Sequence, residues 1–263
     1  MTDFPKISII TINLNNKEGL EKTILSVVSQ VYKDFEYLVI DGESTDGSID
    51  VIKNYSQKID YWKSEKDAGI YNAMNKGISI AKGDYLLFLN SGDVLFDENV
   101  LKNTFEKYQS NEDLLYGKVK LEDRILDYPE KIDFAFFLHH TVCHQSVLIK
   151  RDLFQKFGMY DENFKIISDR LFFLKIFYQS NITSKYLPFI ISIYDQSGIS
   201  ATNTRLLQLE SKQVIDTIIP VEIQKIIEQN NYNKFILSTF PFNFFHSIRN
   251  LLKKIWNKVN QKS

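Results

Sequence analysis

Three short polar clusters in the sequence could do chemistry, and each of them follows a run of apolar residues. Residues 13–16 (NLNN) come after ISIITI, residues 41–46 (DGESTD) after FEYLVI, and residues 90–93 (NSGD) after DYLLFL. Carboxylates bind divalent cations and can take up a proton, and asparagine amides can hydrogen-bond to a base or a ribose. These clusters are the first functional signal in the chain.

The segments around the clusters alternate between two patterns. Apolar, β-branched runs predict strands at residues 6–14, 35–40, 61–63 and 84–89, and helical spacing predicts helices after residue 15, over 48–55 and over 70–81. We expect Asn15 to cap the first helix, with Glu18 reaching back to it. This alternation predicts a three-layer α/β fold around a parallel sheet, in which ligands bind at the carboxyl ends of the strands. All three clusters fall at such ends.

The rest of the chain is less regular. We expect helices at residues 97–108, 151–157 and 169–179, a hairpin of 113–121 with 124–128, an aromatic loop at 134–142, a strand at 187–194, and one or two helices over 204–230. The predicted domain covers residues 1–231, with a nucleotide-binding half (1–95) and an acceptor-binding half (96–231). Residues 232–263 form a separate tail.

Composition excludes several classes of protein. With 263 residues, 44% hydrophobic and 14% aromatic, the chain can bury a sizeable core. Its one cysteine rules out a disulfide framework and a cysteine-based zinc cluster. Neither G-x-G-x-x-G after the first strand nor a P-loop motif is present, which argues against a dehydrogenase or a P-loop enzyme. The N-terminus is interpreted as a first strand and not as a signal peptide, and no apolar run is long enough to span a bilayer.

Several residues near these strand ends have two interpretations each. Asp41 could accept a hydrogen bond from a uracil N–H or a ribose hydroxyl, or it could belong to an ordinary turn. Asp93 could bind a cation carried by a diphosphate, with Gly92 allowing the backbone to approach the phosphates, or the stretch around it (FLNSGDVLF) could be a surface hairpin. The helix over 70–81 could present its first N–H groups to an anion, or it could be only an amphipathic helix whose polar side carries Asn72, Asn75 and Lys76.

The order of these pieces resembles the catalytic core of family 2 glycosyltransferases. The resemblance rests on ISIITINLNN, on QVYKDFEYLVIDGESTDGS, on EKDAGIYNAMNKGI and on AKGDYLLFLNSGD, with weaker support from residues 143–146 (CHQS) and 166–170 (IISDR). It covers roughly residues 5–200. It implies a GT-A (Rossmann-like) α/β/α sandwich with a mixed, mostly parallel sheet, and an enzyme that transfers sugar from a nucleotide-sugar donor with inversion, using Mg²⁺ or Mn²⁺.

The resemblance also implies roles for individual residues. Asp93 would match the last carboxylate of the D-x-D-type metal motif, with His144 at the metal or the diphosphate, or as a structural histidine. Asp169 would be the general base, and Asp195 is the second choice. The donor would be bound by Thr11, Asn13, Asn15, Asp41, Asp67, Gly69, Asn72, Asn75, Lys76, Ser91 and Gly92.

Two departures from the family pattern accompany these assignments. Many relatives have a second acid where Gly42 follows Asp41, and many have D-x-D-D where this chain has NSGD. Because acidic residues are missing at these positions, the protein could instead be a catalytically inactive binding or scaffold protein with the same fold. A sugar nucleotidyltransferase would need a glycine-rich basic loop after the first strand, which is absent.

The tail has a composition of its own. Residues 229–263 carry six basic and no acidic residues, and apolar residues from Phe244 to Val259 share one helical face. We expect an amphipathic helix that binds an anionic membrane surface; the alternative is a helix docked on the domain. The expected protein is therefore a peripheral enzyme on the cytoplasmic face of the membrane, with a lipid-linked glycan acceptor for a bacterial surface polysaccharide (capsule, O-antigen or exopolysaccharide), and with no nucleic acid as partner.

Overall fold

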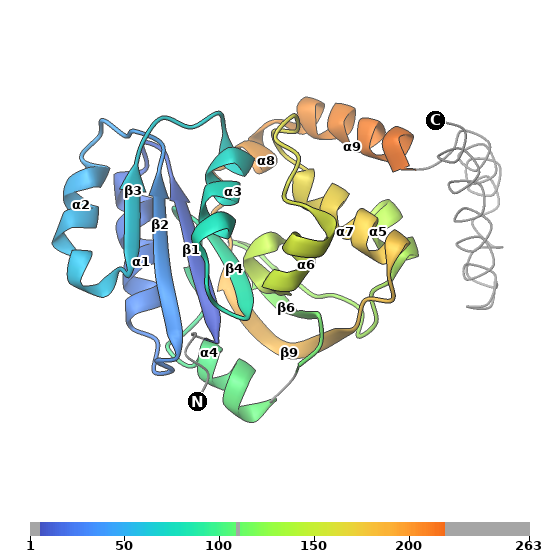
Figure 1. Cartoon of the computed structure of the whole chain (residues 1–263), viewed down its shortest axis with the longest axis horizontal. Helices are drawn as coiled ribbons and strands as arrows, with labels where there is room; N and C mark the ends of the chain where they lie inside the picture. Colours follow the sequence, from blue (N-terminus) through green and yellow to red (C-terminus); the bar gives the residue numbers. More distant parts are fainter. Residues whose placement is uncertain (1–5, 109–110, 219–263) are drawn as a thin grey trace. The chain divides into compact units, whose positions relative to one another are not determined.

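The computed structural model describes residues 6–108 and 111–218 (Figure 1). The contacts divide the chain into two units, Met1–Glu210 and Ser211–Ser263, and the sheet and the cavity described below lie in the first. The predicted boundary at residue 231 and the predicted tail helix lie outside the described residues, so both stay predictions. None of the helices in the described part is long and apolar enough to cross a membrane.

The first half alternates strands and helices as the sequence predicts. Its elements are β1 (Ile7–Asn13), α1 (Lys17–Val28), β2 (Phe35–Asp41), α2 (Ser48–Asn54), β3 (Tyr61–Ser64), α3 (Ile70–Ile80), β4 (Tyr85–Asn90) and the short β5 (Val94–Leu95). Asn16, and not Asn15, caps α1, because its side-chain oxygen accepts the Gly19 N–H while Asn15 takes a left-handed conformation with φ 50°. The prediction for Asn15 as cap was therefore wrong by one residue.

The helices and strands of the second half are mostly short and less regular in their order. It contains α4 (Val100–Lys102) running into a π-helical turn (Asn103–Lys107), β6 (Leu114–Lys120), β7 (Ile125–Leu126), α5 (Phe134–His139), β8 (Val147–Lys150), α6 (Arg151–Phe157), α7 (Ser168–Gln179), β9 (Ser184–Ile193), α8 (Ile199–Thr202) and α9 (Thr204–Ile218). The loop expected at residues 134–142 is wrong in its first half, because Asp133 caps a helix there by accepting the Phe136 N–H. The sequence analysis also missed β8.

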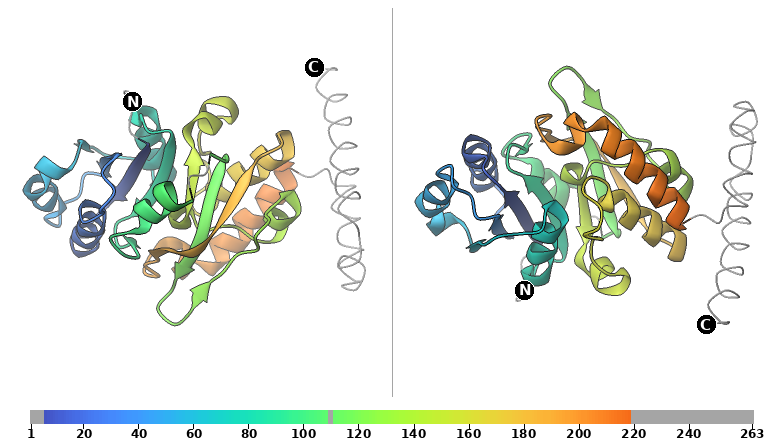
Figure 2. Two further views of the ribbon diagram at one scale, coloured as in Figure 1. Left: turned by 90° about the horizontal axis from the view of Figure 1, so that it is seen from below. Right: turned by 90° about the horizontal axis from the view of Figure 1, so that it is seen from above.

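The strands form one mixed sheet in the order β3-β2-β1-β4-β8-β6-β9-β5, with β7 paired to β6. Strands β3, β2, β1 and β4 are parallel, β8 is antiparallel to both of its neighbours, and β5 is antiparallel to β9. Figure 2 shows the blue-to-teal parallel part beside the green-to-orange part. The three-layer α/β architecture with a mixed, mostly parallel sheet is confirmed.

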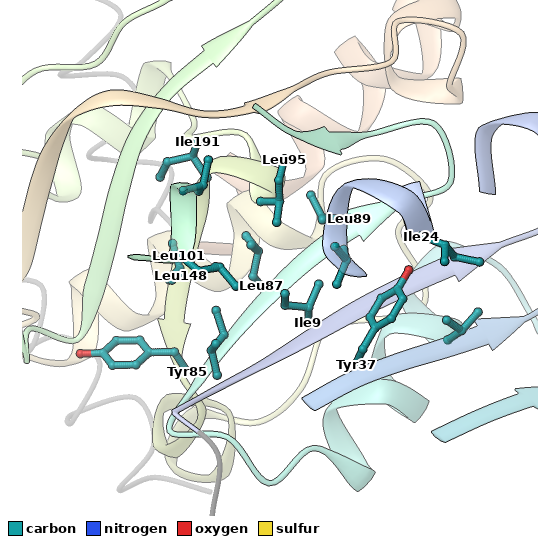
Figure 3. Close-up of a cluster of buried hydrophobic side chains, with 14 of the residues drawn as sticks. Ile9, Ile24, Tyr37, Tyr85, Leu87, Leu89, Leu95, Leu101, Leu148 and Ile191 are labelled. Carbon is teal, nitrogen blue, oxygen red and sulfur yellow. The ribbon is translucent and has the colours of Figure 1, made fainter. Parts of the chain in front are cut away.

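Helices on both faces bury the sheet. On one face, Leu20 and Ile24 of α1 pack with Ile9, Leu87 and Leu89 in the hydrophobic core (Figure 3). On the other face α3 lies so close to β1 that a Cβ added to Gly77 would be 2.5 Å from the Ile10 side chain. Because both faces are covered, successive residues of β1, β2 and β4 are almost all buried, so the ends of these three strands are the exposed place for a site.

The register of these strands brings the polar clusters together. Asn13 pairs with Asp41 across β1 and β2, and Ile12 pairs with Asn90 across β1 and β4. All three strands run in the same direction, so their carboxyl ends share one edge of the sheet. The clusters predicted to converge therefore do so.

Candidate functional site

A cavity of about 580 Å³ opens at this edge of the sheet. Four segments line it: the ends of β1 and β4, the start of α3, and the chain that follows β9. The lining residues are Ile12, Asn13, Leu14, Asn15, Asn16, Asp67, Gly69, Ile70, Ala73, Asn90, Ser91, Asp93, Tyr194, Asp195, Ser197, Gly198 and Ile199. Three of these are carboxylates, and none is Lys, Arg or His.

Asp93 sits on the tight turn that ends β4. Its backbone N–H donates to the Asn90 carbonyl at 2.9 Å, and its Oδ2 accepts the Asn90 N–H at 3.2 Å. Its Oδ1 accepts the backbone N–H of Asp195 at 2.9 Å. Only 2% of Asp93 is exposed, and this burial raises its pKa to about 6 against the opposing pull of His144 and the two N–H donors. Two backbone N–H donors therefore compensate the negative charge of the buried Asp93 carboxylate only in part.

Asp195 reaches Asp93 because of how β5 and β9 pair. Val94 pairs with Ile193 and Leu95 with Ser192, so continuing this antiparallel register places Gly92 opposite Asp195. Gly92 has φ 108°, and a Cβ at this position would lie 2.1 Å from the Asp195 Oδ2. The Asp195 carboxylate therefore lies directly against the backbone of the Ser91-Gly92 turn.

Asp41 is fully buried at the end of β2 and is held by four donors. Its Oδ1 accepts from Asn13 Nδ2 at 2.7 Å and from Ser44 Oγ at 2.6 Å, and its Oδ2 accepts from the Ser44 N–H at 2.9 Å and from Ser64 Oγ at 2.6 Å. Burial acts to raise its pKa, but the hydrogen bonds from Ser44, Ser64 and Asn13 outweigh burial and lower it. Asp41 does not line the cavity, whereas Asn13 does.

The other residues predicted to bind a donor fall into two groups. Asn15, Asp67, Gly69 and Ser91 line the cavity with Asn13, although Asn15 Oδ1 also accepts the Thr45 N–H at 2.8 Å. Thr11 does not reach it: its hydroxyl is buried and accepts from the Tyr37 hydroxyl at 3.0 Å.

The polar side of α3 faces a neighbouring loop and not the cavity. Asn72 and Asn75 each donate to Glu162 at 2.9 Å, and Asn75 also donates to the Tyr160 carbonyl. Lys76 pairs with Glu65 at 3.0 Å. Asn72 and Asn75 therefore fasten the segment before α7, and Lys76 fastens the segment before α3. The role of these three side chains in donor binding stays a prediction.

A second polar cluster lies at the start of α7. The Tyr71 hydroxyl is 3.2 Å from Asp169 Oδ1, and His144 Nδ1 is 3.5 Å from Asp169 Oδ2. Burial acts to lower the pKa of His144, but its hydrogen bond to Asp169 and the nearby charges of Asp169 and Asp93 outweigh burial and raise it. Asp169 and Tyr71 are 7% and 4% exposed. Protonated His144 is therefore a cation placed between the two carboxylates that the sequence analysis singled out.

Sequence reasoning missed four parts of this arrangement. Tyr71 was not singled out, although a tyrosine two residues after Gly69 at a helix start was visible. Asn16 lines the cavity, and the motif Asn16-x-x-Gly19 signals its role as a helix cap. Arg170 fastens α5 by donating from Nε to the Phe137 carbonyl at 3.0 Å. Gly198, which lines the cavity with Ser197 and Ile199, belongs to a turn-like segment that could have marked a loop at the site.

The chemistry of the cavity suits a cation together with an anion. A diphosphate alone would meet Asp67, Asp93 and Asp195 with no basic side chain among the lining residues, so a divalent cation is needed to offset the repulsion. In the described part of the chain, no three His, Cys, Asp or Glu side chains are grouped closely enough to hold a metal by themselves. The residues present therefore fit a metal that the protein and a diphosphate hold jointly.

The architecture and this edge site define the class of protein: the fold is that of the GT-A glycosyltransferases. Its structural neighbours include TarS of S. aureus in complex with UDP-GlcNAc (TM-score 0.65, 17% identity, covering 80% of this chain and 67% of that one). Another is the mannosyltransferase PcManGT from Pyrobaculum calidifontis in complex with GDP-Man and Mn²⁺ (TM-score 0.62, 18% identity, covering 88% and 70%).

Sequence comparison identifies the family. The model for glycosyl transferase family 2 matches residues 8–158. A glycosyltransferase of Mycobacterium tuberculosis without an assigned reaction is 36% identical over 184 residues, covering 66% of this chain and 70% of its own. A PGL/p-HBAD biosynthesis glycosyltransferase of Mycobacterium bovis is 28% identical over 200 residues, covering 74% and 78%. The chain belongs to glycosyltransferase family 2 and is a glycosyltransferase.

Proposed function

We propose that the protein transfers one sugar from a nucleoside-diphosphate donor, with a UDP-sugar favoured, to a glycan acceptor with inversion at the anomeric carbon. The observation that carries the proposal is the carboxylate-lined cavity at the carboxyl ends of β1 and β4, with buried Asp93 at its floor. TarS has been solved with UDP-GlcNAc and PcManGT with GDP-Man, and donors of this kind suit such a cavity.

In this proposal each carboxylate has a separate task. Asp93 would hold Mg²⁺ or Mn²⁺, which when bound neutralises the charge that develops on the leaving diphosphate. Asp169 would take the proton from the acceptor hydroxyl as that oxygen attacks the anomeric carbon. His144 Nδ1 and the Tyr71 hydroxyl, which lie 3.5 Å and 3.2 Å from the two Asp169 oxygens, would keep its carboxylate oriented. Asp41 would not contact the donor directly; it would orient the Asn13 side-chain amide, which donates to it, for donor binding.

Donor hydrolysis tests this proposal. Purified full-length protein with Mn²⁺ and a panel of UDP-Glc, UDP-GlcNAc and GDP-Man should release nucleotide slowly from one donor, and Asp93→Ala should abolish the release. Asp152→Asn, an exposed carboxylate on α6, is the matched control and should leave the rate unchanged. No release from any donor, together with no thermal shift by UDP or GDP, would overturn the proposal. A thermal shift without release would instead favour the inactive binding protein.

The acceptor and the location are further parts of the proposal. A lipid-linked glycan of a bacterial surface polysaccharide would suit the basic, amphipathic composition of residues 232–263, which would keep the enzyme on the cytoplasmic face of the membrane. Liposomes that contain anionic lipid should bind the full chain, and added salt should weaken this binding. Equal binding by a chain that ends near residue 239 would contradict the role of the tail.

A further inference from the structure

We propose that Asp195 is the second carboxylate of the cation–diphosphate site, delivered from the chain after β9 to the place that a side chain at position 92 would otherwise occupy. This inference rests on the proposed function, because it assigns Asp195 to donor binding and removes it as a candidate general base.

The pairing of β5 with β9 is the first observation that carries the proposal. Val94 and Ile193 are partners in an antiparallel ladder, and the same register places Asp195 across from Gly92, 103 positions away in the sequence. The backbone N–H of Asp195 then donates to Asp93 Oδ1 at 2.9 Å. Strand pairing, and not a loop that happens to lie nearby, therefore positions residue 195 beside the residue proposed to hold the cation.

The shape of the turn is the second observation. Gly92 has φ 108°, which L side chains rarely adopt, and the Asp195 Oδ2 fills the space where a Cβ would begin, 2.1 Å from it. The two residues therefore fit each other: glycine at 92 leaves room for a carboxylate that arrives from another strand. An acid at position 92 itself would be strained in this conformation.

The third observation concerns what the Asp195 carboxylate is free to do. Its Oδ1 accepts the Ser197 N–H at 2.9 Å, whereas Oδ2 accepts no hydrogen bond from the described residues. Asp195 lines the same cavity as Asp93, whereas Asp169 does not. Asp195 is thus placed to contact the diphosphate and its cation, and Asp169 alone keeps the environment of a base.

Mn²⁺ binding in the presence of UDP or GDP tests the assignment without any turnover. Free Mn²⁺ is followed by electron paramagnetic resonance in the full-length protein. Asp195→Asn preserves the shape of the side chain, the bond to Ser197 and the backbone contact to Asp93, and removes only the charge. We expect it to weaken nucleotide-dependent Mn²⁺ binding at least about tenfold. Asp152→Asn should bind Mn²⁺ as the unmodified protein does.

A second variant reaches the same contact from the other side. Gly92→Ala should displace the Asp195 carboxylate, weaken Mn²⁺ binding and lower the Tm. In an Asp195→Gly background the same substitution should lower the Tm by less, because the steric conflict is gone and only the backbone strain remains.

Each result decides between assignments. If the unmodified protein binds Mn²⁺ with UDP or GDP and Asp195→Asn binds equally well, the proposal is wrong and the proposed function stands. Suppose that Asp195→Asn binds Mn²⁺ equally well and still hydrolyses the donor but no longer transfers the sugar to an acceptor. Asp195 would then be the general base. If the unmodified protein binds neither nucleotide nor Mn²⁺, both the proposed function and this inference fail.

Discussion

Replacing Asp41 separates a structural role from a role in ligand binding. The buried Asp41 carboxylate accepts four hydrogen bonds, from Asn13, Ser64 and twice from Ser44. In Asp41→Ala these buried donors lose their partner at the end of β2. Each buried donor left unpaired costs about 1–3 kcal/mol, and relief of the desolvation of the carboxylate offsets part of the sum, so we expect a net loss of about 3–5 kcal/mol. A melting temperature that shifts by about 2–4 °C per kcal/mol should then fall by roughly 10 °C.

The assay is thermal denaturation of the full-length protein with and without UDP. Asp46→Ala is the matched control, because Asp46 belongs to the same turn and also accepts three hydrogen bonds, from Lys17 and Ser48, but is exposed. Its loss should cost about 1 kcal/mol, as for a residue that caps a helix start. Because the two carboxylates differ by only one hydrogen bond, the contrast between the two variants measures mainly the effect of burial.

The dependence on pH checks the same reasoning. Because hydrogen bonds hold the pKa of Asp41 below its ordinary value of 3.8, its ionised form stabilises the fold above that value, and this contribution is lost as the pH falls through the lowered pKa. The stability gap between the unmodified protein and Asp41→Ala should therefore be full at neutral pH and should narrow in acid. If Asp41→Ala melts like the unmodified protein but no longer binds UDP, Asp41 is a ligand contact and the structural reasoning is refuted.

Three more predictions concern the two polar clusters and the helix beside them. Tyr71→Phe should leave UDP binding intact and lower the rate of sugar transfer by about tenfold or more, because Asp169 loses the 3.2 Å hydroxyl contact; an unchanged transfer rate would show that Tyr71 only packs. Burial raises the pKa of Asp93 to about 6, so nucleotide-dependent Mn²⁺ binding should weaken as the pH falls through 6 and the carboxylate becomes protonated; binding that is constant between about pH 5 and 8 would contradict this. Arg170→Met should release the end of α5, whose Phe137 carbonyl it binds, and increase hydrogen exchange of α5 before that of α1; equal protection in both proteins would show that packing alone holds α5.

The parallel half of the fold could be predicted because each of its signals is local. Apolar runs, turn clusters and helical spacing repeat at regular intervals up to Asn90, and the polar clusters fall at the strand ends that the register aligns. The segment 134–142 has no such regularity. There the helix depends on Asp133 as its cap and on Arg170 from a distant element, so the aromatic run alone does not indicate it.

Within the site, the sequence located most of the residues but not their contacts. Asn13, Asp67 and Asp93 line the cavity, as expected of residues at strand ends. Asn75 shows why polarity alone misleads, since a helix amide that looks free to bind a ligand is buried and fastens a loop through the Tyr160 carbonyl. The nearness of Asp195 to Asp93 could not be predicted either, because it follows from the pairing of β5 with β9, and β5 has only two residues.

The site shows that the same side chain acquires different properties from the number of donors around it. Asp41 receives four hydrogen bonds, three of them from side chains, and is satisfied within the protein, so its pKa falls. Asp93 is also buried but receives only two backbone N–H groups, so the cost of burying its charge dominates and raises its pKa to about 6. In the proposed function a cation that arrives with a diphosphate would supply the missing partner of Asp93, whereas at Asp41 it would have to displace bonds that the fold already makes. Asp41, whose four hydrogen bonds satisfy its charge, therefore holds the strand ends in place, and Asp93 is the carboxylate that we propose for the cation of the donor.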